Sequence, residues 1–127
     1  MKKLIITAVA LVFSLASAFA QDLQKAKPTK SPDEKSARFT KRMTNELSLE
    51  ATQQERVQAI NLDKFKQIEE VKSMANLDHA TRRQKMKQID DNYFSTLKGI
   101  LTADQFTKFL AMSAEMKEKA FARKHSK

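Results

Sequence analysis

Cysteine is absent from all 127 residues of the chain. Without cysteine there is no disulfide, no thiol nucleophile and no cysteine-based zinc or iron–sulfur site. Small domains in oxidising compartments are commonly stabilised by disulfides. A chain of this size that lacks them must be stabilised by the packing of long helices or by dimerisation.

Glycine and proline are almost as rare, with one glycine, Gly99, and two prolines, Pro28 and Pro32. Residues 33–98 contain neither residue type. β-Rich folds need turns, and turns are where glycine and proline concentrate. The sequence therefore predicts an all-α fold.

The N-terminus has the three parts of an export signal. Lys2 and Lys3 precede an apolar run, and Ala18 and Ala20 form a small-x-small cleavage site. This order is typical of a secretory signal peptide. We expect residues 1–20 to be a signal peptide that is cleaved after Ala20, and the mature protein to reside in the periplasm.

An uncleaved membrane anchor is the alternative to export, but the apolar run is short for a span, which needs about 20 apolar residues. No cysteine follows the run, so lipoprotein processing is excluded. Residues 21–30 are polar, contain Pro28 and show no hydrophobic period. They are predicted to be a disordered leader.

Charge and core size set further bounds on the mature chain. Loss of residues 1–20 leaves 107 residues with a net charge of +7. Only 26 of these 107 residues are apolar and larger than alanine. That number is small for a compact core and favours long amphipathic helices, or a core that a partner completes.

The first helix is expected to begin at Ser31. Ser31 is a good N-cap residue, Pro32 suits the first helical position, and Glu34 completes a capping box at N3. Apolar residues then recur every four positions. This helix should end near Leu47 or Ser48.

The second and third helices carry the longest apolar stripes. The second is predicted over about residues 51–76, with steps of mostly three and four. The third should begin after an N-cap at Asp78 and run to about Lys98. Gly99 is then expected to adopt the left-handed C′ conformation, with Ile100 making the hydrophobic contact that accompanies it.

The fourth helix is predicted to begin with a second capping box, formed by Thr102 and Gln105, and to continue to about residue 123. The predicted helical domain therefore spans residues 31–123, and the basic tail, residues 124–127, should fray. The residues of the fourth helix that follow at near-helical spacing, all apolar except the serine, are Phe106, Phe109, Leu110, Ser113, Met116, Ala120 and Phe121.

A weak internal repeat relates the two halves of the domain. Leu49 and Gln53 recur as Leu101 and Gln105, each 52 residues later. Both pairs fall where one predicted helix ends and the next begins. The chain is therefore predicted to consist of two tandem helix–turn–helix units.

These junctions resemble the Leu-Thr-x-x-Gln motifs of the periplasmic LTxxQ family, the Spy/CpxP-like proteins. Leu101, Thr102 and Gln105 match the motif, whereas the first copy keeps Leu49 and Gln53 but has Glu50 in place of threonine. Residues 60–65 and 83–87 are also similar to Bacteroidetes-type members of that family. The resemblance covers residues 36–123.

The resemblance implies a cradle of four helices per chain, arranged as an antiparallel dimer. Its concave face would be basic with apolar patches. Such proteins bind unfolded clients without ATP, or sense and report envelope stress. No cofactor is implied.

No group of residues in the sequence predicts catalysis. The only histidines are His79, beside a helix start, and His125, in the tail. Neither has a second ligand one helical turn away, so no metal site is predicted. The adjacent acids at 69–70 and 90–91 point in different directions on a helix and are interpreted as solvated. The chain is therefore not expected to be an enzyme.

Basic residues at 41–42, 82–83, 85 and 87 concentrate on the first and third predicted helices. Nucleic acid is the usual partner of such patches, but export separates the chain from it. Acidic segments of clients, anionic lipid or lipopolysaccharide remain as partners. A surface that only keeps the protein soluble is the alternative.

The leading hypothesis is an ATP-independent holdase or an envelope-stress adaptor that binds unfolded envelope proteins. Long-range attraction is assigned to basic side chains, and contact to flexible methionines and aromatic rings. The candidate contact residues are Phe39, Met43, Phe65, Met74 and Met86, and the candidate basic residues are Arg42, Arg82, Arg83 and Lys87.

Two other functions stay open. The chain could be a regulatory module that binds a membrane sensor or a metal ion, or a binder of anionic lipid or lipopolysaccharide. A homodimer is expected in any of these cases, because the second helix is too long for the others to enclose in a globule of this size.

Overall fold

The computed structural model describes residues 29–126, and those residues form four helices and no strand. The predicted all-α fold is therefore confirmed. The predicted signal peptide and most of the predicted leader, residues 21–28, lie outside the described residues, as does Lys127. The helices are α1 (Pro32–Leu47), α2 (Ala51–Ser73), α3 (His79–Ile100) and α4 (Ala103–His125).

Three helices begin where local capping chemistry predicts. The Ser31 hydroxyl accepts a hydrogen bond from the backbone N–H of Glu34 at 3.3 Å at the start of α1. The Asp78 carboxylate accepts one from the backbone N–H of Thr81 at 2.6 Å at the start of α3, and hydrogen bonds from the side chain and then the backbone of Thr81 lower the pKa of Asp78. Thr102 plays the same role for α4. Each cap satisfies an N–H that lacks a partner within the first helical turn.

The predicted end of the second helix, near Asn76, is wrong, because α2 ends at Ser73. The backbone of Met74 is extended, with φ −73° and ψ 95°. Its carbonyl oxygen accepts a hydrogen bond from Nη2 of Arg82, across the turn in α3, at 3.0 Å. Met74 and Ala75 continue the apolar spacing of α2, which is why the sequence predicts a longer helix. That spacing says nothing about the hydrogen bond from Arg82.

The prediction for Gly99 is also wrong. α3 continues through Gly99 to Ile100, and no glycine in the described residues has a positive φ. The chain leaves the helix at Leu101, which is extended and buried, with 7% of its surface exposed. Burial of Leu101 requires an extended turn, so neither the left-handed glycine nor the predicted contact of Ile100 is formed.

The left-handed residue lies instead at the end of α1. Ser48 has φ 53°, and it is the one non-glycine residue in the described part of the chain with a positive φ. Leu47 and Leu49 on either side of it are both buried. A left-handed conformation costs a non-glycine residue about 1–2 kcal/mol, and burial of the two leucines offsets that cost.

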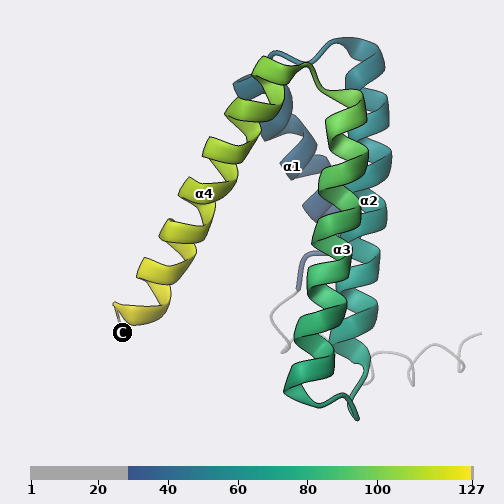
Figure 1. Ribbon diagram of the computed structural model, residues 1–127, viewed down its shortest axis with the longest axis vertical. Coiled ribbons are helices and arrows are strands. Elements are labelled where there is room, and N and C mark those ends of the chain that lie inside the picture. Colours follow the sequence, from purple (N-terminus) through teal and green to yellow (C-terminus); the bar gives the residue numbers. More distant parts are fainter. Residues whose placement is uncertain (1–28, 127) are drawn as a thin grey trace, which may run out of the picture.

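The helices form an open hook rather than a closed bundle (Figure 1). α2 and α3 are an antiparallel hairpin, and α1 packs against α2. α4 starts beside the end of α1 and then runs away from the hairpin. Its first half buries Phe109 and Met112, whereas every residue from Lys117 to Ser126 is exposed.

One hydrophobic core lies where the ends of all four helices meet. Its buried residues come from each helix, from the α1–α2 junction and from the α3–α4 junction. Aromatic rings of α3 and α4 meet edge to face in it, with Phe94 and Phe109 centroids 5.8 Å apart. The buried members are Met43, Leu47, Leu49, Val57, Tyr93, Leu97, Leu101, Phe109 and Met112.

The two motif glutamines join the two helix–turn–helix units at this core. Nε2 of Gln53 donates to Oε1 of Gln105 at 2.8 Å, and Nε2 of Gln105 donates to Oε1 of Gln53 at 3.1 Å. Each Nε2 also donates to the last carbonyl of a helix in the other unit. Gln53 reaches Ile100 at the end of α3 at 3.2 Å, and Gln105 reaches Leu47 at the end of α1 at 3.3 Å.

Each glutamine oxygen also caps its own helix. Oε1 of Gln53 accepts the N–H of Glu50 at 3.0 Å, and Oε1 of Gln105 accepts the N–H of Thr102 at 3.0 Å. An amide offers two donors and two acceptor positions, and all four are used on both residues. Glu50 thus supports the same cap that Thr102 does, because the bond uses its backbone rather than its side chain.

We expect Gln105→Glu to destabilise the fold by about 2–3 kcal/mol at neutral pH. A carboxylate cannot donate to Leu47 or Gln53, so acceptors face acceptors. The same repulsion raises the pKa of the new carboxyl in the folded state. The loss should therefore shrink as pH falls through that raised pKa, because the protonated acid can donate one bond. Urea unfolding at pH 7 and pH 4.5, relative to wild type, measures both effects.

Gln84→Glu is the matched control, because Gln84 is exposed on α3 and makes no side-chain hydrogen bond among the described residues. It should change stability by no more than about 0.5 kcal/mol. Equal stability of Gln105→Glu and wild type at pH 7 would show that the glutamine pair does not hold the units together.

Gly99→Ala should stabilise the protein by about 0.5–1 kcal/mol, because alanine is the better helix former and restricts the unfolded chain. A Cβ at this position would meet no atom within 4 Å. Thermal unfolding followed by circular dichroism checks this. A lower midpoint would contradict the helical conformation of Gly99 and favour the left-handed one.

Candidate functional site

A chain of buried polar groups crosses the interior from α1 to α3. Asn61 on α2 is fully buried. Its Nδ2 donates to Oγ1 of Thr40 on α1 at 2.9 Å, and its Oδ1 accepts from the Tyr93 hydroxyl on α3 at 2.5 Å. The sulfur of Met43 receives longer contacts from both groups, at 3.6 and 3.7 Å. Asn61 therefore joins three helices at one level.

The same chain continues along α1 toward the surface. The Thr40 hydroxyl donates to the carbonyl of Ser36 at 2.8 Å, and Nε2 of Gln58 donates to the Ser36 hydroxyl at 3.0 Å. Buried polar groups are costly unless paired, so a different register of these helices would leave several of them unsatisfied. The network thus favours one register of α1 on α2.

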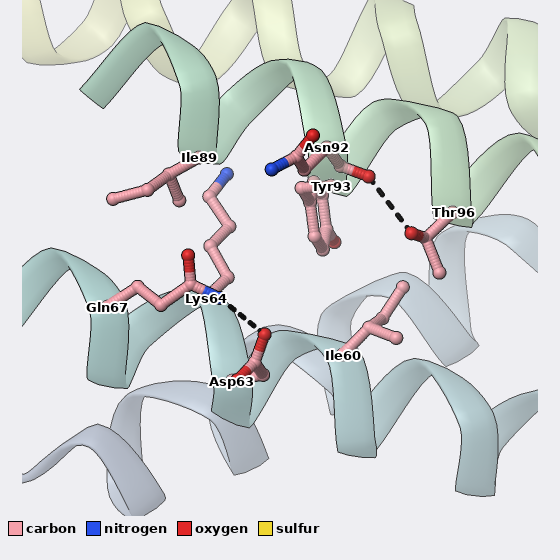
Figure 2. Close-up of a pocket in the computed structure, with 8 residues that line it drawn as sticks. All are labelled: Ile60, Asp63, Lys64, Gln67, Ile89, Asn92, Tyr93 and Thr96. Atoms are coloured by element: carbon pink, nitrogen blue, oxygen red, sulfur yellow. Dashed lines mark hydrogen bonds between the residues drawn. The ribbon is translucent and has the colours of Figure 1, made fainter. Parts of the chain in front are cut away.

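A groove between α2 and α3 lies beside this network (Figure 2). Nζ of Lys64 is 4.3 Å from the centre of the Tyr93 ring and 3.2 Å from Oδ1 of Asp90. Nε2 of Gln67 donates a hydrogen bond to Oδ2 of Asp63 at 2.6 Å. The groove has a volume of about 70 Å³, well below the roughly 300–1,000 Å³ of small-molecule sites.

Tyr93 lines the groove, and its hydroxyl donates to Oδ1 of the buried Asn61. Burial raises the pKa of Tyr93 well above its ordinary value. The phenol is therefore neutral at physiological pH and is committed as a donor, so it is available neither as a base nor as a nucleophile.

The predicted contact residues fall in separate places. Phe39 on α1 and Phe65 on α2 are half-buried and meet edge to face, with ring centroids 6.1 Å apart and an interplanar angle of 87°. Met43 is completely buried. It belongs to the hydrophobic core, so no partner can touch its side chain in this structure.

Met74 and Met86 lie near the other end of the α2–α3 hairpin and are both half-buried. Nη2 of Arg82 is bonded to the Met74 carbonyl at 3.0 Å, and its Nε is buried without a hydrogen-bond partner. Arg82 therefore braces the turn. Met74 is nine residues beyond Phe65 on the chain, which corresponds to about 13 Å along a helix.

The other predicted basic residues are more accessible. Arg83 and Lys87 are exposed on α3, and Lys87 is paired with Asp91 at 2.7 Å, which raises the pKa of Lys87. Arg42 on α1 is paired with Glu46 at 2.7 Å. Exposed i, i+4 pairs of this kind contribute little to stability and leave the cations able to meet other anions.

Two surface residues were not among the sequence candidates. Leu110 is 46% exposed and Phe121 is 64% exposed, and they are the large hydrophobic residues of the described chain that remain so accessible. The sequence places both in one apolar stripe with Phe109 and Met116. Counting 100° per residue would have separated them, because Leu110 and Phe121 share a face of α4 that the buried residues do not.

Residues 29–126 contain no group of three or more histidines and acids placed to hold a metal ion. His79 is the first residue of α3, and the imidazole of His125 meets the Phe121 ring edge to face with centroids 4.1 Å apart. Within the same residues, no helix combines the length and the apolar character needed to cross a bilayer.

The buried phenol gives a direct test of the interior. Tyr93 is the only tyrosine and tryptophan is absent, so phenolate absorbance reports on this residue alone. We expect no ionisation at the ordinary pKa near 10 while the protein is folded. Because the folded pKa is raised, stability should be lost as pH rises above about 10. Ionisation and loss of helical circular dichroism should then coincide in an alkaline titration.

Tyr93→Phe serves as the control, since it removes the absorbance change and leaves Oδ1 of Asn61 without its donor. A gradual titration of the wild-type phenol near pH 10 with helicity intact would show that Tyr93 is accessible to water.

No curated protein and no solved structure gave a significant match. A family model described as a domain of unknown function, DUF4890, matches residues 20–109. The match covers well over half of the chain, from the end of the predicted signal peptide through α1, α2 and α3 to Phe109 in α4. The chain therefore belongs to the DUF4890 family.

Proposed function

We propose that this protein is an ATP-independent holdase or envelope-stress adaptor of the periplasm. The observation that carries the proposal is the composition of the distal hairpin, by which we mean residues 70–89 of α2, the turn and α3. The ion pair between Lys35 near the start of α1 and Glu69 on α2 has a length of 3.3 Å, and the α2–α3 hairpin continues beyond the start of α1 (Figure 1). Beyond that point two helices form a single layer.

A single layer cannot enclose its apolar residues. In the distal hairpin only Val71 and Ile89 are buried, with 6% and 8% of their surface exposed. Met74, Leu77 and Met86 remain partly accessible. Unbranched methionine side chains adapt to differently shaped partners, so this surface suits weak contact with many unfolded segments.

Positive charge surrounds these apolar residues. Arg83 and Lys87 are exposed on α3, and Lys85 beside them is partly exposed. Exposed charge accelerates encounter with acidic partners more than it strengthens the final complex. Fast capture and easy release are what a holdase without an energy source requires.

The proposed location depends on the sequence of residues 1–20, whose charged start, apolar run and cleavage site are typical of export. Outside the cytoplasm there is no ATP supply. The chain also has one glycine in total, and so lacks the glycine-rich loop that cradles nucleotide phosphates. These two facts support a binding protein that works without nucleotide.

A second candidate, binding of anionic lipid or lipopolysaccharide, is favoured by the outer face of α1. Arg38, Lys41, Arg42, Asn45 and Glu46 line an open hollow of about 280 Å³. Arg38 and Lys41 are exposed and form no ion pair among the described residues. Flotation with anionic and neutral vesicles tests this candidate, and binding only to anionic vesicles would support it.

The holdase proposal predicts that the exported chain, at equimolar ratio, suppresses light scattering by an unfolded client at low and moderate salt. Met74→Gln combined with Met86→Gln should weaken suppression several-fold, because each change removes roughly 1 kcal/mol or more of apolar contact. Arg83→Gln with Lys87→Gln should instead slow capture, and mostly at low salt.

Ala59→Gln with Ala122→Gln is the matched control, because both alanines are exposed on helices outside the distal hairpin. It should leave suppression unchanged. Absence of suppression by the wild-type chain would exclude the holdase function. An equal loss in the control pair would show that clients do not use the distal hairpin.

A further inference from the structure

Methionine supplies all the sulfur of this chain, because cysteine is absent. Of the six methionines, Met1 lies in the predicted signal peptide and the other five lie in the described residues. Oxidation converts the apolar thioether of methionine to a polar sulfoxide, and reductases can reverse the change. Its effect on the protein depends on which of the five sulfurs an oxidant can reach.

Two of the five methionines are protected by burial. Met43 has no exposed surface, and Met112 has 3% of its surface exposed. The Met43 sulfur also contacts Nδ2 of Asn61 at 3.6 Å and the Tyr93 hydroxyl at 3.7 Å. An oxidant must reach a lone pair of the sulfur, and in Met43 that approach is occupied. These two sulfurs should therefore react only when the core opens locally.

The two methionines of the distal hairpin are in a different position. Met74 and Met86 are partly accessible, and neither sulfur has a hydrogen-bond partner among the described residues. Met74 follows the last residue of α2 and has an extended backbone, so a polar side chain there interrupts no helix. An oxygen on either sulfur would replace apolar surface at the place where clients are proposed to bind.

We propose that Met74 and Met86 are oxidation sites for hypochlorous acid, and that their conversion to sulfoxides switches off client binding. The inference rests on the holdase function proposed for the distal hairpin. Hypochlorous acid is a small two-electron oxidant that reacts with thioethers without a cofactor. The sulfur gives an electron pair to chlorine as the Cl–O bond breaks, and water then replaces chloride on sulfur. The net products are the sulfoxide, chloride and one proton.

The sulfoxides weaken contact without removing the attraction. A sulfoxide is polar, as a glutamine side chain is, so it removes apolar contact in the same way. The charges of Arg83 and Lys87 are unchanged, so clients are still attracted but are not retained. Two electrons and two protons from a dithiol return each sulfoxide to the thioether and release water. The loss of binding is therefore reversible.

The order of oxidation is measured by peptide mass spectrometry after treatment of the exported chain with limiting hypochlorous acid. This measurement depends on no client. We expect the sulfoxide fraction at Met74 and Met86 to exceed that at the two buried methionines by at least about tenfold, because buried sulfurs wait for local opening. Circular dichroism verifies that the helices persist. Equal oxidation of buried and accessible methionines would overturn the two sites.

Light scattering by an unfolded client tests the control of binding. The oxidised wild type should lose suppression several-fold, and the two methionine sulfoxide reductases with a dithiol should restore it. Met74→Leu with Met86→Leu removes both sulfurs but keeps the apolar volume, so this variant should keep its suppression after oxidation. Met116→Leu is the matched control, because Met116 is also partly accessible but packs against the core. It should lose suppression as the wild type does.

The outcomes distinguish the switch from the holdase function. Retained suppression by the oxidised wild type, or loss of suppression in the oxidised double leucine variant, would overturn the switch alone. Protection by Met116→Leu would also overturn it, because the sensitive sulfur would then lie on α4. A wild type that suppresses no scattering before oxidation would overturn the holdase function and the switch together, whatever the order of oxidation.

Discussion

The paired amides of Gln53 and Gln105 are the contact on which the arrangement of the four helices depends. Each amide caps its own helix, binds the other amide and donates to the last carbonyl of a helix from the other half of the chain. An α-helix leaves its first N–H groups and last C=O groups unpaired. Here the ends of α1 and α3 and the starts of α2 and α4 meet, and the two amides form hydrogen bonds with their unpaired backbone groups. The two sequence repeats are thus two halves of one polar junction.

That junction explains why the molecule is open elsewhere. The hydrophobic core surrounds the helix ends. Few buried apolar residues therefore lie in the distal hairpin or in the second half of α4. The Asn61–Tyr93 network fixes the register of α1, α2 and α3 at mid-height. Beyond the glutamine junction and the Asn61–Tyr93 network, the helices form single layers with one side exposed to solvent. The surface proposed for clients lies on such a layer.

The candidate site was only partly predictable from the sequence. Amphipathic spacing identifies which residues share a helix face, but it does not tell which face meets another helix. Met43 and Met86 have similar spacing, yet Met43 is fully buried and Met86 is partly accessible. Arg82 was predicted to be a basic surface residue, but its side chain donates to the Met74 carbonyl and braces the hairpin turn. The exposed positions of Leu110 and Phe121 follow from the direction in which α4 leaves the core.

The sequence by itself determined the helical class, the four helices and the starts at Ser31, Asp78 and Thr102, because capping and apolar period are local. The helix ends were decided by tertiary structure. Burial of Leu101 let α3 pass through Gly99, and the two buried leucines around Ser48 held that residue left-handed. The offset of 52 residues marked the two glutamines as equivalent. Only the tertiary structure showed that the two glutamines touch, because the contact joins two helix–turn–helix units that are far apart in the sequence.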